Sequence, residues 1–526
     1  MKIERTKNAA RNMLFGTITR TYQIIIPFLM RTAMTYFMGV RYLGLNSLFI
    51  SILQVLNLAE LGVGSAMIYS MYRPIAEDDQ EKICALMRLY KKYYRVIGVV
   101  IAAAGLLLTP FIPKLISGDV PAGINVYTLY LLNLSATVLS YWLFAYKSSI
   151  LYAHQRTDVI SRVTLVTSSG QYMVQFLVLW LLRDYYIYIL VMLGTQAVTN
   201  ILTAAAAGRL YPDCVPRGEL DRESVREING RIRDLFTSKI GSVVVSSADT
   251  IVISAFLGLS ALAVYQNYYF ILSSVMSFVA IAFSACTAGI GNSIVVESRE
   301  KNFNDLKKFT FLTAWTGGFC SACFLCLFQP FMKIWMGEEL VLPYSVVVCF
   351  CIYFFVFEIN QLLNTYKDAG GIWHEDRFRP LVTALANLGM NLAMVQFWGI
   401  YGIILSTVLS MLFVGMPWLL HNLFSLLFEK ARLKGYLKSL LFYTAVSLLA
   451  CSVTAFACSF IRLGDWGTFL ARAAVCCAAP NAVFYGIYRR TGEFRAALQL
   501  MDKMTGGKFR LEQRLAGRSR KGGEAG

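Results

Sequence analysis

Fourteen long apolar runs, separated by short polar segments, constrain this chain more than any other feature of its sequence. A helix needs about 20 mostly apolar residues to cross the roughly 30 Å hydrocarbon core of a bilayer. The runs are too long and too uniform for the alternating strands, about ten residues each, of a transmembrane barrel. With 57% hydrophobic and 15% charged residues, the chain is also too apolar for a soluble multidomain protein. The sequence predicts an all-α polytopic membrane protein with about 14 helices, at 14–39, 45–72, 92–112, 125–146, 163–182, 185–208, 237–258, 264–296, 309–332, 343–366, 381–398, 400–422, 437–461 and 467–488.

The basic residues predict the orientation of these helices. Most of the 49 Lys and Arg residues lie in the two tails and in the even-numbered loops between runs. The odd-numbered loops hold five, namely Arg41, Lys114, Arg183, Lys333 and Arg462. Because Lys and Arg stay on the cytoplasmic side during insertion, both termini are expected to be cytoplasmic. We expect the basic C-terminal tail to contact anionic lipid headgroups, and we expect no nucleic-acid partner.

An internal repeat is visible in the loops. The segments "TPFIPKLISGD" and "QPFMKIWMGEE" place Pro110–Phe111 and Pro330–Phe331 220 residues apart, and Gly39 and Gly258 lie 219 apart in similar turns. An even number of helices per half makes the repeat parallel, and transporters built this way bind substrate between their halves. The predicted division is a six-helix bundle at 1–210, a cytoplasmic linker at 211–236, a second six-helix bundle at 237–424, two added helices in 425–490 and a basic cytoplasmic tail at 491–526.

Five ionisable residues stand out inside the predicted helices: Arg20, Arg31, Glu60, Asp249 and Glu358. Such residues are costly in a membrane and normally face the bundle interior or water, with a partner. Arg20 and Arg31 are eleven residues apart, so they share a helix face over about 16 Å of rise. Glu60, with Asn57 on the same side of its helix, falls at a height between the two arginines. Alternatively, Arg31 and Glu60 neutralise each other and only lock two helices together.

Polar stripes continue on three further predicted helices. They include Gln171 and Gln175 on the fifth, Ser246 and Asp249 on the seventh, and Glu358 and Gln361 on the tenth. Taken together, these stripes indicate a hydrated cavity for a polar ligand. Taken singly, each stripe is also explained by hydrogen bonds between packed helices.

The sequence offers little for catalysis. His154, His374 and His421 are scattered, and no phosphate-binding glycine loop is present, so we expect a transporter without catalytic residues or cofactor. Cys320, Cys323 and Cys326 have a helical i, i+3 spacing that suggests a metal as one alternative. Without a second ligand cluster, packing is the favoured interpretation, and no metal site is expected.

The stretches "YLGLNSLF", "LAELGVGSA" and "MYRPIAEDD" within the first hundred residues resemble the bacterial polysaccharide-transport proteins, the oligosaccharide-unit flippases. These belong to the superfamily shared with multidrug and toxic-compound extruders (MATE) and lipid II flippases. The resemblance implies a MATE-like fold and a flippase in the bacterial cytoplasmic membrane. Its implied cargo is an undecaprenyl-pyrophosphate-linked oligosaccharide for surface polysaccharide synthesis. It also implies contact with membrane lipids, and a polysaccharide polymerase and glycosyltransferases as partners.

Carried onto this chain, the resemblance implies that Arg31 and Arg20 meet the pyrophosphate, with Glu60 orienting the arginine and Asn57 beside it. Arg41 contributes when the cavity opens outward, and Asp249 and Glu358 are candidates for ion coupling. The guanidinium binds phosphate oxygens in a two-bond fork, and exclusion of water strengthens this contact. An inside-negative potential favours outward movement of an anion by about 2.3 kcal/mol per charge per 100 mV.

Three alternatives remain open. A cation-coupled multidrug extruder of the same fold binds cationic substrates, and Arg31 weighs against it. A membrane-embedded sugar transferase is disfavoured because no catalytic cluster is present. A non-transporting scaffold of an envelope-assembly complex would retain the fold alone.

Overall fold

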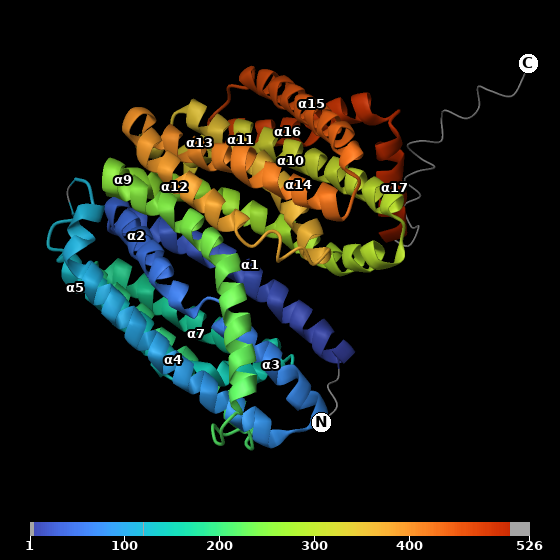
Figure 1. Cartoon of the computed structure of the whole chain (residues 1–526). Helices are drawn as coiled ribbons and strands as arrows, with labels where there is room; N and C mark the ends of the chain where they lie inside the picture. The colour runs from blue at the N-terminus through green and yellow to red at the C-terminus, as the bar shows by residue number, and fades with distance from the viewer. Residues whose placement is uncertain (1–4, 119, 505–526) are drawn as a thin grey trace, which may run out of the picture. The chain divides into compact units, whose positions relative to one another are not determined.

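The computed structural model describes residues 5–118 and 120–504, without the side chains at 5–15, 17, 238, 242, 246, 288 and 500–504. Within these residues all regular secondary structure is helical, with no strand, which confirms the predicted all-α fold class (Figure 1). The predicted tail beyond residue 504 lies outside the described residues. The chain is a multi-pass membrane protein, because most of its helices are long and apolar enough to cross a bilayer.

The helices divide between two compact units. Unit 1 runs to Gln266 and adds Asn391–Gly399, and unit 2 takes Asn267–Met390 and the chain from Ile400 onward. The helices up to α8 are α1 (Arg5–Phe37), α2 (Val40–Leu56), η1 (Asn57–Glu60), α3 (Val63–Glu77), α4 (Gln80–Leu108), η2 (Thr109–Leu115), α5 (Val126–Trp142), η3 (Ala145–Lys147), α6 (Ser148–Ala153), α7 (Thr157–Leu177), η4 (Val178–Leu182) and α8 (Tyr185–Leu210).

Helix α9 (Arg222–Val296) continues from unit 1 into unit 2. It is followed by α10 (Arg299–Met336), η5 (Glu338–Leu340), α11 (Tyr344–Ala369), α12 (Arg379–Trp398), α13 (Ile400–Ser410), η6 (Met411–Gly415), α14 (Met416–Leu426), η7 (Lys430–Arg432), α15 (Leu433–Ser459), α16 (Asp465–Tyr488) and α17 (Gly492–Met504). In unit 1, α7 packs on α1 and α8, and α4 packs on α3 and α5. In unit 2, α10 packs on α11, α15 and α16.

Among the described residues, eleven helices are long and apolar enough to cross a membrane, or twelve if the bent pair formed by Val126–Trp142 and Ala145–Ala153 is one span. The predicted spans 237–258 and 264–296 both lie in α9, which has 75 residues and non-helical backbone at Gly258. The predicted first span lies in α1. The total of fourteen membrane spans stays a prediction. It differs from the number of candidate spans in the structure at two helices, α1 and α9.

The predicted span 45–72 is broken in the structure. Helix α2 ends at Leu56, η1 follows, and α3 begins only after Gly62, which adopts a left-handed conformation with φ of 88°. A Cβ on Gly62 would lie 2.7 Å from the Leu235 Cβ and 3.0 Å from the Ile232 carbonyl oxygen of α9. Glycine is needed here for both its backbone conformation and its small size. A broken membrane helix is the kind of element that forms binding sites in transporters.

The predicted linker 211–236 is only partly non-helical. It is irregular through Asp221, and α9 begins at Arg222, where the Ser224 backbone N–H donates to the Asp221 carboxylate at 2.8 Å. Asp221 thus caps the helix, as short polar side chains commonly do. The remaining predicted linker residues belong to α9.

Two turns that the sequence pairs have the same backbone geometry. Gly39, between α1 and α2, has φ 101° and ψ 162°, and Gly258, within α9, has φ 87° and ψ 174°. A second pair, Gly118 and Gly337, has φ values of 81° and 88° and is also 219 residues apart. Because L-residues rarely adopt positive φ, glycine is favoured at all four positions.

Candidate functional site

The break in the second predicted span carries Glu60. The Tyr94 hydroxyl of α4 donates a hydrogen bond to Glu60 Oε1 at 3.3 Å, and the Tyr90 hydroxyl donates to the Tyr94 oxygen at 2.6 Å. The carboxylate also interacts with the backbone N–H of Gly64, in the first turn of α3. A negative charge at that position is stabilised by the helix dipole and the unpaired N–H groups. A Cβ on Gly64 would lie 3.0 Å from Glu60 Oε1, so glycine leaves room for this contact.

A cation and an amide complete this cluster. The charge of Lys239, an exposed residue of α9, acts on the Glu60 carboxylate, and its Nζ donates to Ser65 Oγ at 3.4 Å. The Tyr141 hydroxyl of α5 donates to Asn57 Oδ1 at 3.2 Å. The sequence pattern selected Glu60 and Asn57 but missed the tyrosines and Lys239. We define Asn57, Glu60, Tyr94, Tyr141 and Lys239 as the helix-break cluster.

Arg31 belongs to a second cluster in the same unit. It is partly exposed on α1, and its charge acts on the Tyr188 hydroxyl of α8. The Tyr188 carbonyl oxygen accepts a hydrogen bond from Gln175 Nε2 at 3.2 Å, and Gln171 Nε2 donates to Gln175 Oε1 at 3.2 Å. The structure thus groups three predicted site residues around one tyrosine. Tyr188 was not among the site residues predicted from the sequence. We call Arg31, Gln171, Gln175 and Tyr188 the arginine cluster.

The remaining predicted residues of unit 1 are more dispersed. Gln175 is fully buried, and its amide links α7 to α8. This contact agrees with the alternative that the polar stripe on this helix serves helix packing. Arg20 on α1 and Arg41 at the start of α2 are both exposed. Asp249 on α9 accepts a hydrogen bond from Asn391 Nδ2 of α12 at 2.7 Å. Ser246 lies in α9, but its side chain is outside the described part of the structure.

In unit 2, Glu358 is buried on α11 with 2% of its surface exposed. Neither carboxyl oxygen has a hydrogen-bond partner among the described residues. A buried carboxyl group without a partner is stable only in its neutral form, because ionising it in apolar surroundings is very costly. Gln361 lies about one turn further along α11 and is partly buried.

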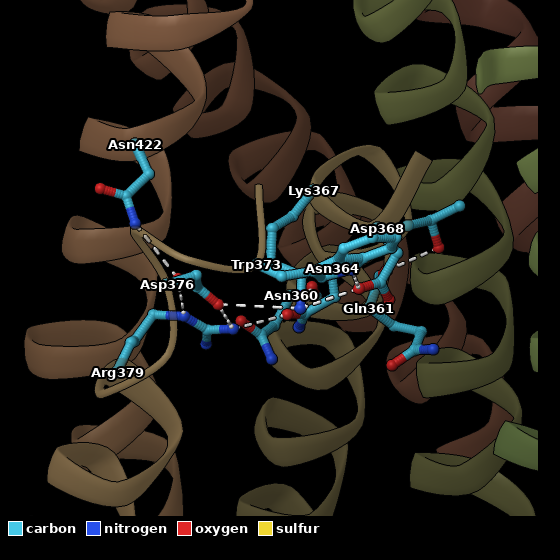
Figure 2. A network of polar contacts seen from close by, with 10 residues as sticks. Asn360, Gln361, Asn364, Lys367, Asp368, Trp373, Asp376, Arg379 and Asn422 are labelled. Carbon is cyan, nitrogen blue, oxygen red and sulfur yellow. Dashed lines mark hydrogen bonds and ion pairs between the residues drawn. The ribbon is translucent and has the colours of Figure 1, made fainter. Parts of the chain in front are cut away.

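Figure 2 shows a polar network in unit 2 that the sequence analysis missed. Arg379 donates two hydrogen bonds to Asp376, at 2.7 and 2.8 Å, and one to Asn364 Oδ1 at 2.7 Å. Asn422 Nδ2 of α14 donates to Asp376 at 3.2 Å. Asp376 and Arg379 are both buried, with 1% and 6% of their surfaces exposed, respectively. The signal was present in the charged stretch "HEDRFRP", although nothing in the sequence told which of its charges would be buried.

Comparisons with known proteins show the fold. No protein-family model matches the chain, and no curated protein matches it. A lipid II flippase MurJ in an inward closed conformation matches with a TM-score of 0.66 at 15% identity, over 91% of this chain and 99% of its own. An inward-facing MATE-family multidrug resistance transporter of the MOP superfamily matches with a TM-score of 0.62 at 12% identity, over 80% of this chain and 99% of its own.

A further similar structure is a MOP-superfamily transporter from Pyrococcus furiosus, described as having a binding pocket of reverse polarity that suggests a different function. It matches with a TM-score of 0.51 at 11% identity, over 81% of this chain and 96% of its own. The chain therefore has the fold of these flippases and transporters. The expected MATE-like fold is confirmed at this level.

Proposed function

We propose that this chain is a transporter that moves an undecaprenyl-pyrophosphate-linked oligosaccharide from the inner to the outer leaflet of the bacterial cytoplasmic membrane. The observation that carries the proposal is Arg31, a partly exposed residue within the first predicted membrane helix whose charge acts on the Tyr188 phenol. Arginine binds phosphate oxygens through two parallel hydrogen bonds, and phenol groups supply further donors. The fold likeness to a lipid II flippase supports the transport class.

The proposed mechanism is alternating access between two parallel six-helix bundles. The equal backbone geometry at Gly39 and Gly258, and at Gly118 and Gly337, supports the repeat that this mechanism needs. In transporters with such repeats, the substrate site lies between the repeats near the bilayer midplane. Arg20 and Arg41, both exposed, fit a series of cationic contacts along the path of the headgroup.

The helix-break cluster has a different role in this proposal. Glu60 contacts Tyr94, Gly64 and Lys239. These contacts favour a structural role, in which Glu60 holds the broken helix together. They do not favour the predicted role of orienting Arg31. Asn57, bonded to Tyr141, lies in the same cluster. A broken helix bends at small energetic cost, which suits a bundle that rocks.

For coupling, we assign Glu358 to proton transfer ahead of Asp249. Glu358 is buried without a partner, and a carboxyl group in that state changes charge only when it becomes hydrated or paired. Asp249 already accepts a hydrogen bond from Asn391. Uptake and release of a proton by the Glu358 carboxyl group would thus accompany a change in its exposure to water. The membrane potential supplies an additional driving force for outward movement of the anionic headgroup.

A cation-coupled multidrug extruder is the second candidate, because the fold is shared with MATE transporters and Glu60 and Asp249 are carboxylates in predicted spans. A non-transporting scaffold of an envelope-assembly complex is the third. In the flippase proposal, both termini are cytoplasmic, and a polysaccharide polymerase and glycosyltransferases act beside the chain.

Replacing Arg31 distinguishes these candidates. Loss of lipid-linked oligosaccharide transport in Arg31→Ala, at unchanged protein abundance, supports the flippase. Transport of cationic dyes by the wild-type chain supports the extruder, and absence of both activities supports the scaffold.

A further inference from the structure

Three cysteines that are distant in sequence converge inside unit 2. Cys326 on α10, Cys458 on α15 and Cys476 on α16 have Sγ atoms that all lie within 4.8 Å of one another. All three are buried, with 4%, 2% and 0% of their surfaces exposed, and all are free thiols. Cys323, one helical turn before Cys326, packs against this trio. The structure therefore supplies the second set of ligands that the stretch around Cys326 lacks in the sequence.

The contacts of these thiols differ from those of other buried cysteines. Cys351 Sγ donates to the Ser321 carbonyl oxygen at 3.4 Å, and Cys84 Sγ donates to the Asp213 carbonyl oxygen at 3.3 Å. In the trio, by contrast, the three sulfur atoms interact with one another. Cys476 Sγ also contacts the Ala322 carbonyl oxygen, at the longer distance of 4.0 Å. Sulfur atoms gathered around a common point from three helices form the geometry of a ligand set.

The spacing of the sulfur atoms fits a metal–thiolate centre. Metal–sulfur bonds of about 2.3 Å place tetrahedral ligand atoms about 3.8 Å apart, so a small contraction of the trio closes a site. Cys323 and Cys326 have the Cys-x-x-Cys spacing common in zinc centres. Thiolate ligands select Zn²⁺ and Cu⁺ over harder ions such as Mg²⁺ or Ca²⁺. Each thiol that binds the ion releases one proton to solvent.

A cationic group lies next to the trio. The charge of Arg472 on α16, four residues before Cys476, acts on both Cys326 and Cys458. Its Nε is buried without a hydrogen-bond partner among the described residues. A metal centre with three or four thiolates carries net negative charge, which a neighbouring guanidinium offsets. Arg472 Nη2 donates to the Ile461 carbonyl oxygen at 3.4 Å, which leaves the buried Nε available to an anionic centre.

A cavity in unit 2 is lined by residues that are close in sequence to the three cysteines. This cavity, of about 440 Å³, is lined by Gln329 of α10, Ile461 beyond α15 and Arg472 of α16, together with eight other residues. These three residues lie three, three and four positions from Cys326, Cys458 and Cys476, respectively. The cavity is therefore lined by α10, by α16 and by the segment that follows α15, at positions about one helical turn in sequence from the cysteines.

We propose that Cys326, Cys458 and Cys476, with Cys323 as a fourth ligand where the ion requires one, form a thiolate site for a thiophilic metal ion, Zn²⁺ or Cu⁺. The ion joins α15 and α16, the two helices that follow the predicted repeat, to α10. Bound metal adds its binding free energy to the stability of this three-helix contact. The proposal is independent of the transported substrate.

Metal binding by the purified full-length chain tests this site. The reduced protein is equilibrated in detergent with Zn²⁺ alone or with Cu⁺ alone under anaerobic, metal-buffered conditions, and bound metal is measured by mass spectrometry. We expect one ion per chain, with affinity reduced at least about tenfold in Cys458→Ser and Cys476→Ser, since even outer-shell changes cost 10- to 100-fold. Cys477→Ser is the matched control, because Cys477 is the exposed neighbour of Cys476.

Thermal unfolding keeps the test decisive if a variant folds poorly. The ion should raise the Tm of wild type and of Cys477→Ser, and leave that of Cys458→Ala unchanged. Zn²⁺ binding that depends on Cys323 supports a four-ligand site, and Cu⁺ binding that does not depend on it supports a three-ligand site. The proposal is overturned by the absence of stoichiometric binding of either ion. It is also overturned by binding that survives Cys458→Ser, or by a disulfide within the trio in the metal-free protein as isolated.

Discussion

The Tyr94 hydroxyl donates a 3.3 Å hydrogen bond to the Glu60 carboxylate at the point where the second membrane segment breaks. This contact links α4 to the end of η1, and the Gly64 N–H links the same carboxylate to the start of α3. One side chain thus bridges both sides of the break. Tyr94 lies 34 residues away along the chain, so only the folded structure brings it to Glu60, whereas Gly64 is a local partner four residues away.

Tyr94→Phe should destabilise the helix-break cluster. The substitution removes one donor to a half-buried carboxylate while keeping the aromatic ring, and loss of such a hydrogen bond costs about 1–3 kcal/mol. We expect a lower Tm in detergent and slower transport. Tyr36→Phe, at a tyrosine with 83% of its surface exposed, is the control and should change neither. An unchanged Tm in Tyr94→Phe would show that the hydrogen bond contributes nothing to the break.

Gly62→Ala should be more harmful than alanine at another glycine of unit 1. Its positive φ and the 2.7 Å approach of a new Cβ to Leu235 Cβ add strain from two sources. We expect a loss of about 1–3 kcal/mol in the free energy of unfolding. Gly170→Ala in α7 has open space around the new Cβ and should be neutral or slightly stabilising. Equal unfolding of the two variants would contradict the account of the break.

Arg379→Ala should strongly destabilise the connection between α11 and α12. Removing one partner of a buried ion pair costs about 3–5 kcal/mol, and the lower end applies here because Lys367 and Asn422 also contact Asp376. We expect faster proteolysis between residues 370 and 378 and a lower Tm. Arg377→Ala, at the exposed neighbouring arginine, is the control. Resistance to protease equal to wild type would refute a structural role for this network.

A pH effect is expected from His154, which lies between α6 and α7. Burial lowers the pKa of this imidazole from its ordinary value of about 6.5. Its Nδ1 contacts the Ile150 carbonyl oxygen at 2.9 Å, and its ring packs on Tyr211. Because the folded state favours the neutral ring, stability is fully present above about pH 6.5 and is lost as pH falls through the folded-state pKa.

The Tm of wild type should therefore decrease between pH 7 and pH 5. His154→Gln should reduce this decrease, whereas His374→Gln, at an exposed histidine, should leave it as in wild type. The same pH dependence in wild type and His154→Gln would assign the effect to other groups.

The sequence was sufficient for the fold class because lipid leaves the backbone few choices: an apolar run of about 20 residues satisfies its N–H and C=O groups only as a helix. It was also sufficient to select Arg31, Glu60 and Glu358, since charge inside an apolar run is conspicuous. The break at Gly62 was harder to predict, because it depends on the approach of Leu235 from α9.

Sequence patterns did not predict which residues of different helices contact one another. Arg31 meets Tyr188, which lies 157 residues further along the chain, and Cys326 meets Cys458 and Cys476 from two other helices. Periodicity within one helix tells which residues share a face, but not which face of which other helix it meets. Similarly, the charged stretch around Asp376 has the composition of an exposed loop, and its burial depends on Asn364 and Asn422 of neighbouring helices.

The most direct test of the central claim, a headgroup contact by Arg31, is the rate of lipid translocation in reconstituted vesicles. An undecaprenyl-pyrophosphate-linked saccharide is placed in the inner leaflet, and its appearance outside is followed with a membrane-impermeant sugar-modifying enzyme. A charged hydrogen bond is worth about 1.5–3 kcal/mol, so Arg31→Ala should slow translocation about 10- to 100-fold, and Arg31→Lys should restore part of the rate. Arg209→Ala, at an exposed arginine near the end of α8, should translocate at the wild-type rate. Translocation by Arg31→Ala at the wild-type rate and at equal protein abundance would contradict the claim.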